Sequence, residues 1–158
     1  AFYFEVQRVN MIYIRSRAAA LMAIQSTDPK PFVRALENDV KLLSRARPRY
    51  AAAMAYSADA QLQYLQGNRQ NSAAKMKASA DVFKEVSMKS FAMSHLWAAG
   101  LLADPREEAW IEKSREWLET QGIRNPLKTV LCAVPILYAE KQFANQRPAA
   151  ATSPPKAQ

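Results

Sequence analysis

Few side chains in this sequence could support catalysis or metal binding. His95 is the only histidine and Cys132 the only cysteine among 158 residues. A two-histidine metal site is therefore excluded, and zinc would need unusual help from carboxylates. The only glycines, Gly67, Gly100 and Gly122, lie far apart, so no glycine-rich phosphate-binding loop exists. We therefore predict a non-enzymatic protein that needs no metal and no cofactor.

The remaining reactive side chains fit structural roles. Cys132 lies in the apolar stretch 130–134, where we expect a small buried residue rather than a reactive thiol. His95 lies within a predicted helix, where a buried or half-buried structural histidine is more common than a catalytic one. Glutamates that cluster next to basic residues indicate a solvated helix face: Glu107, Glu108, Glu112, Glu116 and Glu119. The tryptophans recur at helical spacing, so we expect core positions rather than stacking on nucleic-acid bases: Trp97, Trp110 and Trp117.

The charge of the chain is strongly positive, at +8 from 22 basic and 14 acidic residues. The excess lies in the first two thirds and is densest at Arg45, Arg47 and Arg49, beside Tyr50. These arginines could contact the phosphates of a nucleic acid or another polyanion. They lie between two predicted helices, and we favour a solvated turn with basic residues near a helix C-terminus.

The elements that must position these residues are predicted to be helices. The chain is poor in glycine, rich in alanine and leucine, and lacks a run of alternating β-branched residues. Apolar periodicity, proline and glycine predict six helices, a short capping helix, and an Ala/Pro/Gln-rich tail that we expect to be disordered. The helices span about 2–24, 31–46, 49–66, 71–86, 90–102 and 104–121; the capping helix spans about 126–134 and the tail 144–158.

Buried-type positions recur at an interval of 34 residues. Ala80 and Phe83 are matched by Ser114 and Trp117. A helical period of 34 is that of the tetratricopeptide repeat (TPR), with two antiparallel helices per unit. We therefore predict an all-α fold in which helix pairs at about 2–46, 49–86 and 90–121 stack as a TPR-like right-handed α-solenoid, in one domain covering residues 1–143.

Residues 31–126 also resemble a narrower family. The resemblance rests on "ALENDVKLLSRARPRYAAAM", "LQGN", "VSMKSFAMSHLWAAGLL" and, most specifically, "WLETQGIRNP". These phrases are similar to the TPR-like C-terminal helical region of large bacterial multidomain signalling proteins, which carry an upstream serine/threonine kinase or ATPase module. The resemblance implies a regulatory, cytoplasmic fragment of a longer chain. No catalytic residue carries over, because the kinase or ATPase part is absent from these residues.

The leading functional hypothesis is a scaffold that docks a protein or peptide segment. In stacked helix pairs, the first helix of each pair lines the concave side. We therefore expect exposed residues of the helices at 49–66 and 90–102 to make the contacts, with Gln61, Tyr64, Ser94 and His95 as candidates.

Two alternatives remain open. The first is a basic helical module in which Arg45, Arg47 and Arg49 bind a polyanion, although we expect a protein partner rather than nucleic acid. The second is a structural role, in which the chain packs against its upstream kinase or ATPase domain or forms a homodimer. The longest apolar run, 130–139, is too short to span a bilayer, so we predict no membrane span.

Overall fold

Helices make up all the regular secondary structure of residues 2–146, which are the part of the chain described by this computed structural model. The expected all-α class is confirmed. Within the described residues there are seven α-helices, followed by two short 3₁₀ helices: α1 (Phe2–Gln25), α2 (Lys30–Ser44), α3 (Arg49–Leu65), α4 (Arg69–Glu85), α5 (Lys89–Leu102), α6 (Glu108–Thr120), α7 (Pro126–Ala133), η1 (Pro135–Ala139) and η2 (Lys141–Gln146).

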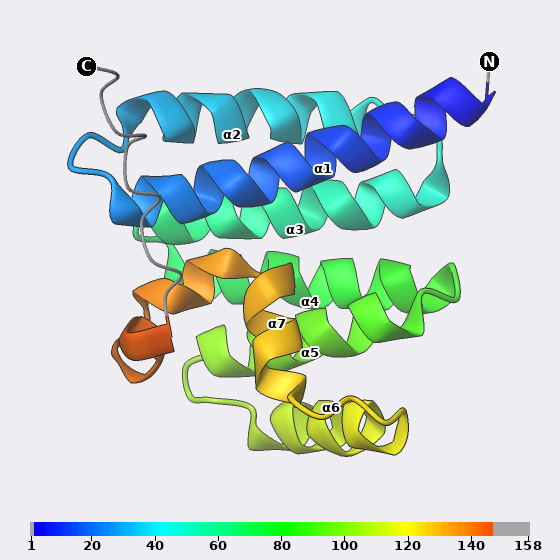
Figure 1. The fold of residues 1–158 in the computed structure, drawn as a ribbon, viewed down its shortest axis with the longest axis vertical. Coiled ribbons are helices and arrows are strands. Elements are labelled where there is room, and N and C mark those ends of the chain that lie inside the picture. The colour runs from blue at the N-terminus through cyan, green and yellow to red at the C-terminus, as the bar shows by residue number, and fades with distance from the viewer. Residues whose placement is uncertain (1, 147–158) are drawn as a thin grey trace, which may run out of the picture.

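The helices stack in the order of the sequence (Figure 1). Each of the first six packs against the next, α1 also packs on α3, and α7 packs on α5. Figure 1 shows α1, α2 and α3 at one end of the molecule and α6 at the other, with α7 crossing α5. This arrangement places α3, α4 and α5 in the middle, where their alanine-rich surfaces allow close packing.

Three of the helices end in the same backbone motif. After α3, α4 and α6, the residue following the last turn has a positive φ: 85° at Gly67, 63° at Ser87 and 77° at Gly122. At each end a backbone amide reaches back five residues, as from Asn68 to the Gln63 carbonyl at 2.8 Å. This Schellman motif satisfies carbonyl groups that the helix leaves unpaired. The helix ends expected at Gly67 and Gly122 are confirmed. The same motif after α4 uses a serine, Ser87, so no glycine in the sequence indicates it.

The predicted start of the sixth helix is wrong. Asp104 and Pro105 do not cap it; they lie in a loop, joined by a cis peptide bond, and α6 begins at Glu108. Gly100 sits inside α5 rather than at its end, where a Cβ would lie 2.9 Å from the Glu107 carbonyl oxygen. The loop before α6 is therefore longer than predicted. The missing side chain at Gly100 lets the start of α6 lie close against α5.

The interval of 34 residues holds for packing positions but not for helix starts. Ala80, Phe83 and Ser114 are all buried, and Trp117 is half-buried. However, α3 and α4 begin at Arg49 and Arg69, whereas α5 and α6 begin at Lys89 and Glu108, so matching helices start more than 34 residues apart.

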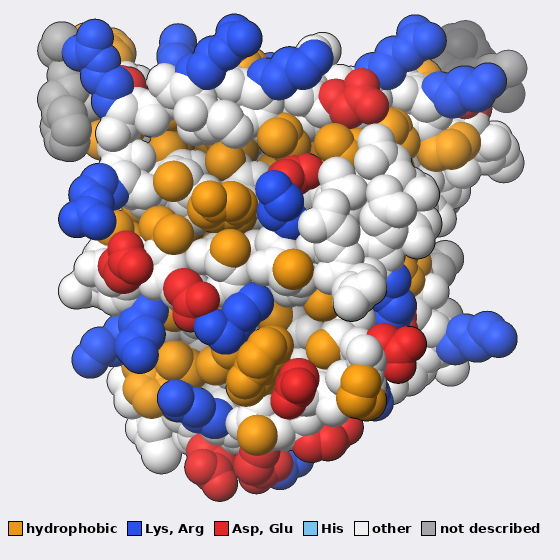
Figure 2. Space-filling view, turned by 180° about the vertical axis from the view of Figure 1, so that it is seen from behind, with side chains coloured by type: hydrophobic (Ala, Val, Ile, Leu, Met, Phe, Trp, Pro, Cys, Tyr) orange, Lys and Arg blue, Asp and Glu red, His pale blue; other side chains and the backbone are white. Residues whose placement is uncertain are grey.

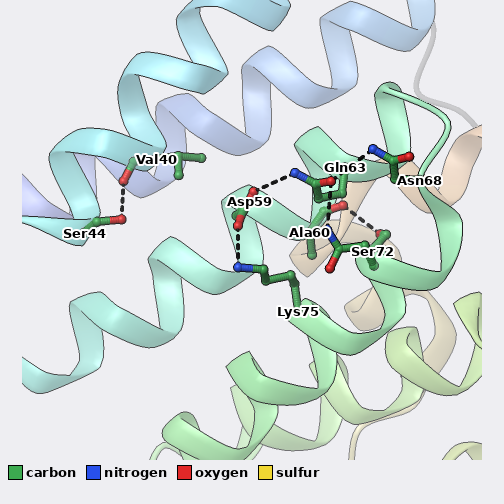
Figure 3. A network of polar contacts seen from close by, with 9 residues as sticks. Val40, Ser44, Asp59, Ala60, Gln63, Asn68, Ser72 and Lys75 are labelled. Carbon is green, nitrogen blue, oxygen red and sulfur yellow. Dashed lines mark hydrogen bonds and ion pairs between the residues drawn. The ribbon is translucent and has the colours of Figure 1, made fainter.

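Polar side chains hold α3 and α4 in register (Figure 3). Ser72 Oγ donates to the Ala60 carbonyl at 2.7 Å, and Ser79 Oγ donates to the Ala53 carbonyl at the same distance. Nearer the surface, Lys75 Nζ lies 3.0 Å from Asp59 Oδ2. Small residues bring the two helices close, and their hydroxyls pair with otherwise buried carbonyls.

The segment after α7 folds back over the stack. Val134, Ile136 and Leu137 are fully buried, and η1 packs against both α1 and α3. Phe143 in η2 is also buried. The predicted tail boundary at residue 144 is therefore too early, because η2 continues to Gln146; residues 147–158 of the predicted tail lie outside the described residues.

Candidate functional site

The expected binding face on α3 and α5 is closed. Gln61 and His95 are fully buried, and Ser94 is nearly so. Helix α1 packs over α3, and η1 packs over both of them. The expectation that these three side chains are exposed is wrong, since α1 and η1 pack on α3, α7 packs on α5, and Tyr13 of α1 contacts His95. A buried side chain cannot contact a partner on this face.

Tyr64, the fourth candidate, is half-buried and bonded within the chain. Its hydroxyl donates to Glu140 Oε1 at 2.5 Å, and Arg69 Nη1 lies 2.5 Å from the same oxygen. Burial opposes ionisation of Glu140, but the bonds from Arg69 and Tyr64 win and lower the pKa of its carboxyl. Burial and the Glu140 bond raise the pKa of Tyr64 to about 12. Tyr64 therefore anchors the returning segment.

His95 lies at the centre of a buried polar cluster that joins three helices. Its Nδ1 lies 2.7 Å from the Phe91 carbonyl oxygen, which assigns the proton to Nδ1. Its Nε2 can then accept, with Ser57 Oγ at 2.9 Å and the Tyr13 hydroxyl at 3.1 Å. Burial lowers the pKa of His95 to about 4, against a raising effect of the Phe91 bond and with a further lowering by Arg17.

The contact between Ser57 and His95 has the geometry of a nucleophile and its base. Both side chains are fully buried, and Tyr13 covers them with only 3% of its surface exposed. No substrate atom can reach Ser57 Oγ in this arrangement. We therefore assign the cluster to joining α1, α3 and α5, which agrees with the structural role expected for His95.

An open cavity of about 510 Å³ lies between α1, α5 and α7. Arg17 of α1, Phe91 of α5 and Lys128 of α7 contribute to its lining. Cys132 also lines it and is exposed, so the expectation of a buried cysteine is wrong. Its neighbours Leu131 and Ala133 turn toward the core and leave Cys132 on the open side of α7.

Helix α1 carries large apolar side chains on its solvent side. Met11, Ile14 and Met22 share one side with Phe4, while Val9 and Ala20 are buried on the other. The exposed fractions are 68% for Tyr3, 75% for Phe4, 65% for Met11, 51% for Ile14 and 42% for Met22. We call these five residues the α1 apolar face. The sequence signal for it is a helix that is apolar on two sides, which usually indicates burial on both.

The candidate polyanion residues lie where the sequence predicts them, at the turn between α2 and α3. Arg45, Arg47 and Arg49 are all exposed. Glu5 Oε1 accepts from the Arg47 backbone amide at 3.3 Å, and Glu85 lies 3.6 Å from Arg49. Figure 2 shows Lys and Arg side chains along the edge formed by α2 and acidic side chains at the opposite end, formed by α6. The basic edge is solvated and partly paired.

Neither a metal centre nor a membrane span is found in residues 2–146. These residues contain no group of three or more His, Cys, Asp or Glu side chains arranged to hold a metal ion. No helix among them is both long and apolar enough to cross a bilayer. No protein-family model matches the chain, and no significant match was found among curated proteins or solved structures. The chain's own geometry must therefore support any functional conclusion.

Proposed function

We propose that this chain is a non-catalytic protein-interaction module that docks a helix of another protein on the α1 apolar face. One observation carries the proposal: five large apolar side chains share the solvent side of α1, and no element of residues 2–146 covers them. Several exposed large apolar side chains on one side of a helix commonly mark an interaction site. A helical partner fits because apolar residues recur along α1 at helical spacing.

The charges beside the face select the chemistry of the partner. Helix α1 carries the exposed Arg8 and Arg15 but only one acidic residue, Glu5, and Arg15 is also paired with the buried Asp39 of α2. An amphipathic helix with acidic residues on both sides of its apolar stripe would match these cations. A second copy of the chain would bring arginines together, so the charge pattern favours a different protein over a homodimer.

The wider context follows from the sequence resemblance and stays part of the proposal. The stacked helices are compatible with a TPR-like right-handed solenoid in which η1 fills the groove. In a regulatory region of a cytoplasmic bacterial signalling protein, α1 would present its apolar face to the helix of such a partner.

The test compares two exposed apolar residues on different helices. Met11→Glu places a charge in the middle of the α1 apolar face, and Leu42→Glu makes the same change on α2, where Leu42 is 37% exposed. Binding of the partner recovered with the unaltered chain should fall about 30-fold or more with Met11→Glu. Leu42→Glu should leave it unchanged. Equal effects of the two changes would refute the proposed surface.

Light scattering at several concentrations separates this proposal from the homodimer. We expect a monomer at micromolar concentration. A dimer that Met11→Glu dissociates would show that α1 binds a second copy instead.

Polyanion binding is a second candidate function, favoured by the basic edge along α2 in Figure 2. It predicts retention on heparin at low salt that weakens steeply as salt rises, because bound cations displace counterions. Replacing Arg45, Arg47 and Arg49 together by Gln should abolish that retention. If the unaltered chain is not retained, this candidate is excluded.

A further inference from the structure

The cavity between α1, α5 and α7 has the composition of a small-molecule site. Its volume of about 510 Å³ lies within the range of about 300–1,000 Å³ that is common for ligand pockets. Phe91 and Ile123 give it an apolar wall, whereas the hydroxyl of Thr129 donates to the Asn125 carbonyl oxygen at 3.3 Å. An apolar body with a polar group at one end would match this lining.

The charge of the cavity is positive. Arg17 and Lys128 both line it, and none of its lining residues among the described part of the chain is acidic. Arg17 Nε is buried and has no hydrogen-bond partner, and its guanidinium carbon lies 5.2 Å from the centre of the Tyr13 ring. Arg17 as a whole is half-buried and lines the cavity, so its positive charge favours an anion there.

A second cavity shows why this one stands out. About 240 Å³ in volume, it lies between α2 and α3, and its charged lining residues Asp59 and Lys75 pair with each other at 3.0 Å. Figure 3 shows this pair pointing at one another. The charged side chains of the second cavity therefore neutralise each other. In the first cavity no acidic lining residue neutralises Arg17.

We propose that the cavity between α1, α5 and α7 binds a small amphipathic anion, with its charged group at Arg17 and its apolar body against Phe91 and Ile123. Lys128 at the exposed rim adds attraction for the same charge. The site goes beyond the proposed docking function, because it does not use the five residues of the α1 apolar face.

Cys132 provides the test, because it is the only cysteine of the chain and lines the cavity. The rate of its alkylation by iodoacetamide should fall in a saturable way with sodium decanoate below the micellar concentration. Acetate, which lacks the apolar body, and decyltrimethylammonium, which carries the opposite charge, should not slow it. Equal protection by decanoate and decyltrimethylammonium, or none by decanoate, would overturn the proposal.

Matched variants locate the charge that matters. Arg17→Met should weaken decanoate binding about tenfold, since it removes a charge-assisted hydrogen bond. Arg34→Met, the same change on the exposed side of α2, should have no effect. Because Arg17 also contacts Tyr13, the exposed Lys128→Gln is the second variant, with an expected loss of about twofold. An effect of Arg34→Met as large as that of Arg17→Met, or no effect of either cavity variant, would overturn the proposal.

Discussion

Two faces of the stack differ from a regular repeat. The inner face, between α3 and α5, is buried rather than open for binding, and the outer face of α1 exposes large apolar side chains. The inner face is closed by His95, Ser57 and Tyr13, with η1 packing on α1 and α3 and α7 packing on α5. The outer face of α1 leaves Met11 and Ile14 in solvent. The position of a helix within a pair therefore does not decide which surface is free. It depends on which elements pack across the face, namely α1 and η1 on α3 and α7 on α5.

The two faces also differ in what holds them. The inner face combines buried apolar side chains with the hydrogen-bonded cluster of His95, Ser57 and Tyr13, which makes it part of the core. The side chains of the α1 apolar face lie in solvent, so they add little to the free energy of unfolding. Truncating an apolar side chain should therefore destabilise the protein on the inner face and leave its stability nearly unchanged on the outer one.

The largest expected difference concerns the returning segment. Leu137→Ala removes a fully buried side chain in η1 and should lower the free energy of unfolding by about 4 kcal/mol. Ile14→Ala on the α1 apolar face should change it by less than about 0.5 kcal/mol. Urea unfolding of both variants checks this. Similar effects at the two sites would mean that η1 does not seal the inner face.

Acid should weaken the inner face through His95. Its pKa is about 4 in the folded chain and about 6.5 when unfolded. Burying neutral His95 therefore costs no protonation free energy above pH 6.5. As the pH falls from 6.5 to below 4, the free energy of unfolding should drop by up to about 3 kcal/mol. His95→Gln should remove most of this pH dependence between 6.5 and 4.5, since the chain has no other histidine. An unchanged slope in the variant would show that His95 is not buried as a neutral group.

A smaller loss is expected where the returning segment is anchored. Glu140→Gln keeps the shape of the side chain but removes the charge that Arg69 and Tyr64 contact, and it should cost about 1–2 kcal/mol. The pKa of Tyr64, followed by its ultraviolet titration, should fall from about 12 toward its ordinary value, although burial keeps it raised. A Tyr64 titration that does not respond would contradict the contact.

The smallest expected effect has the opposite sign. Gln61 is fully buried, and neither atom of its amide has a hydrogen-bond partner. Gln61→Met has nearly the same shape without the polar group, so it should raise the free energy of unfolding by about 1 kcal/mol. Thermal unfolding would detect the gain. A clear loss instead would mean that the Gln61 amide is paired on the inner face.

The sequence predicts the helices well because their signals are local. Apolar periodicity and the stops at Gly67 and Gly122 depend on neighbouring residues, and they locate all seven α-helices to within a few residues. The late start of α6 is missed because it depends on how closely α6 can approach Gly100. For His95 the expectation of a buried or half-buried structural residue is confirmed, and its expectation as an exposed contact residue is wrong.

The surfaces could not be predicted in the same way. The apolar run at 130–139 reveals burial, but not that η1 would pack on α1 and close the inner face. Gln61, Ser94 and His95 are buried where α1 and η1 pack on α3 and where α7 packs on α5, and such long-range contacts leave no local signal. Likewise, apolar residues on two sides of α1 indicate two buried sides, yet the described residues cover only one.

The most direct test of the central claim is site-specific photo-crosslinking from the α1 apolar face. A photoreactive amino acid at position 11 should link the chain to a segment of another protein with helical apolar spacing and acidic flanks, identified by mass spectrometry. The same amino acid at position 42 on α2 should not form this link. Equal crosslinking from both positions, or a link from position 11 only to a second copy of the chain, would contradict the proposed docking surface.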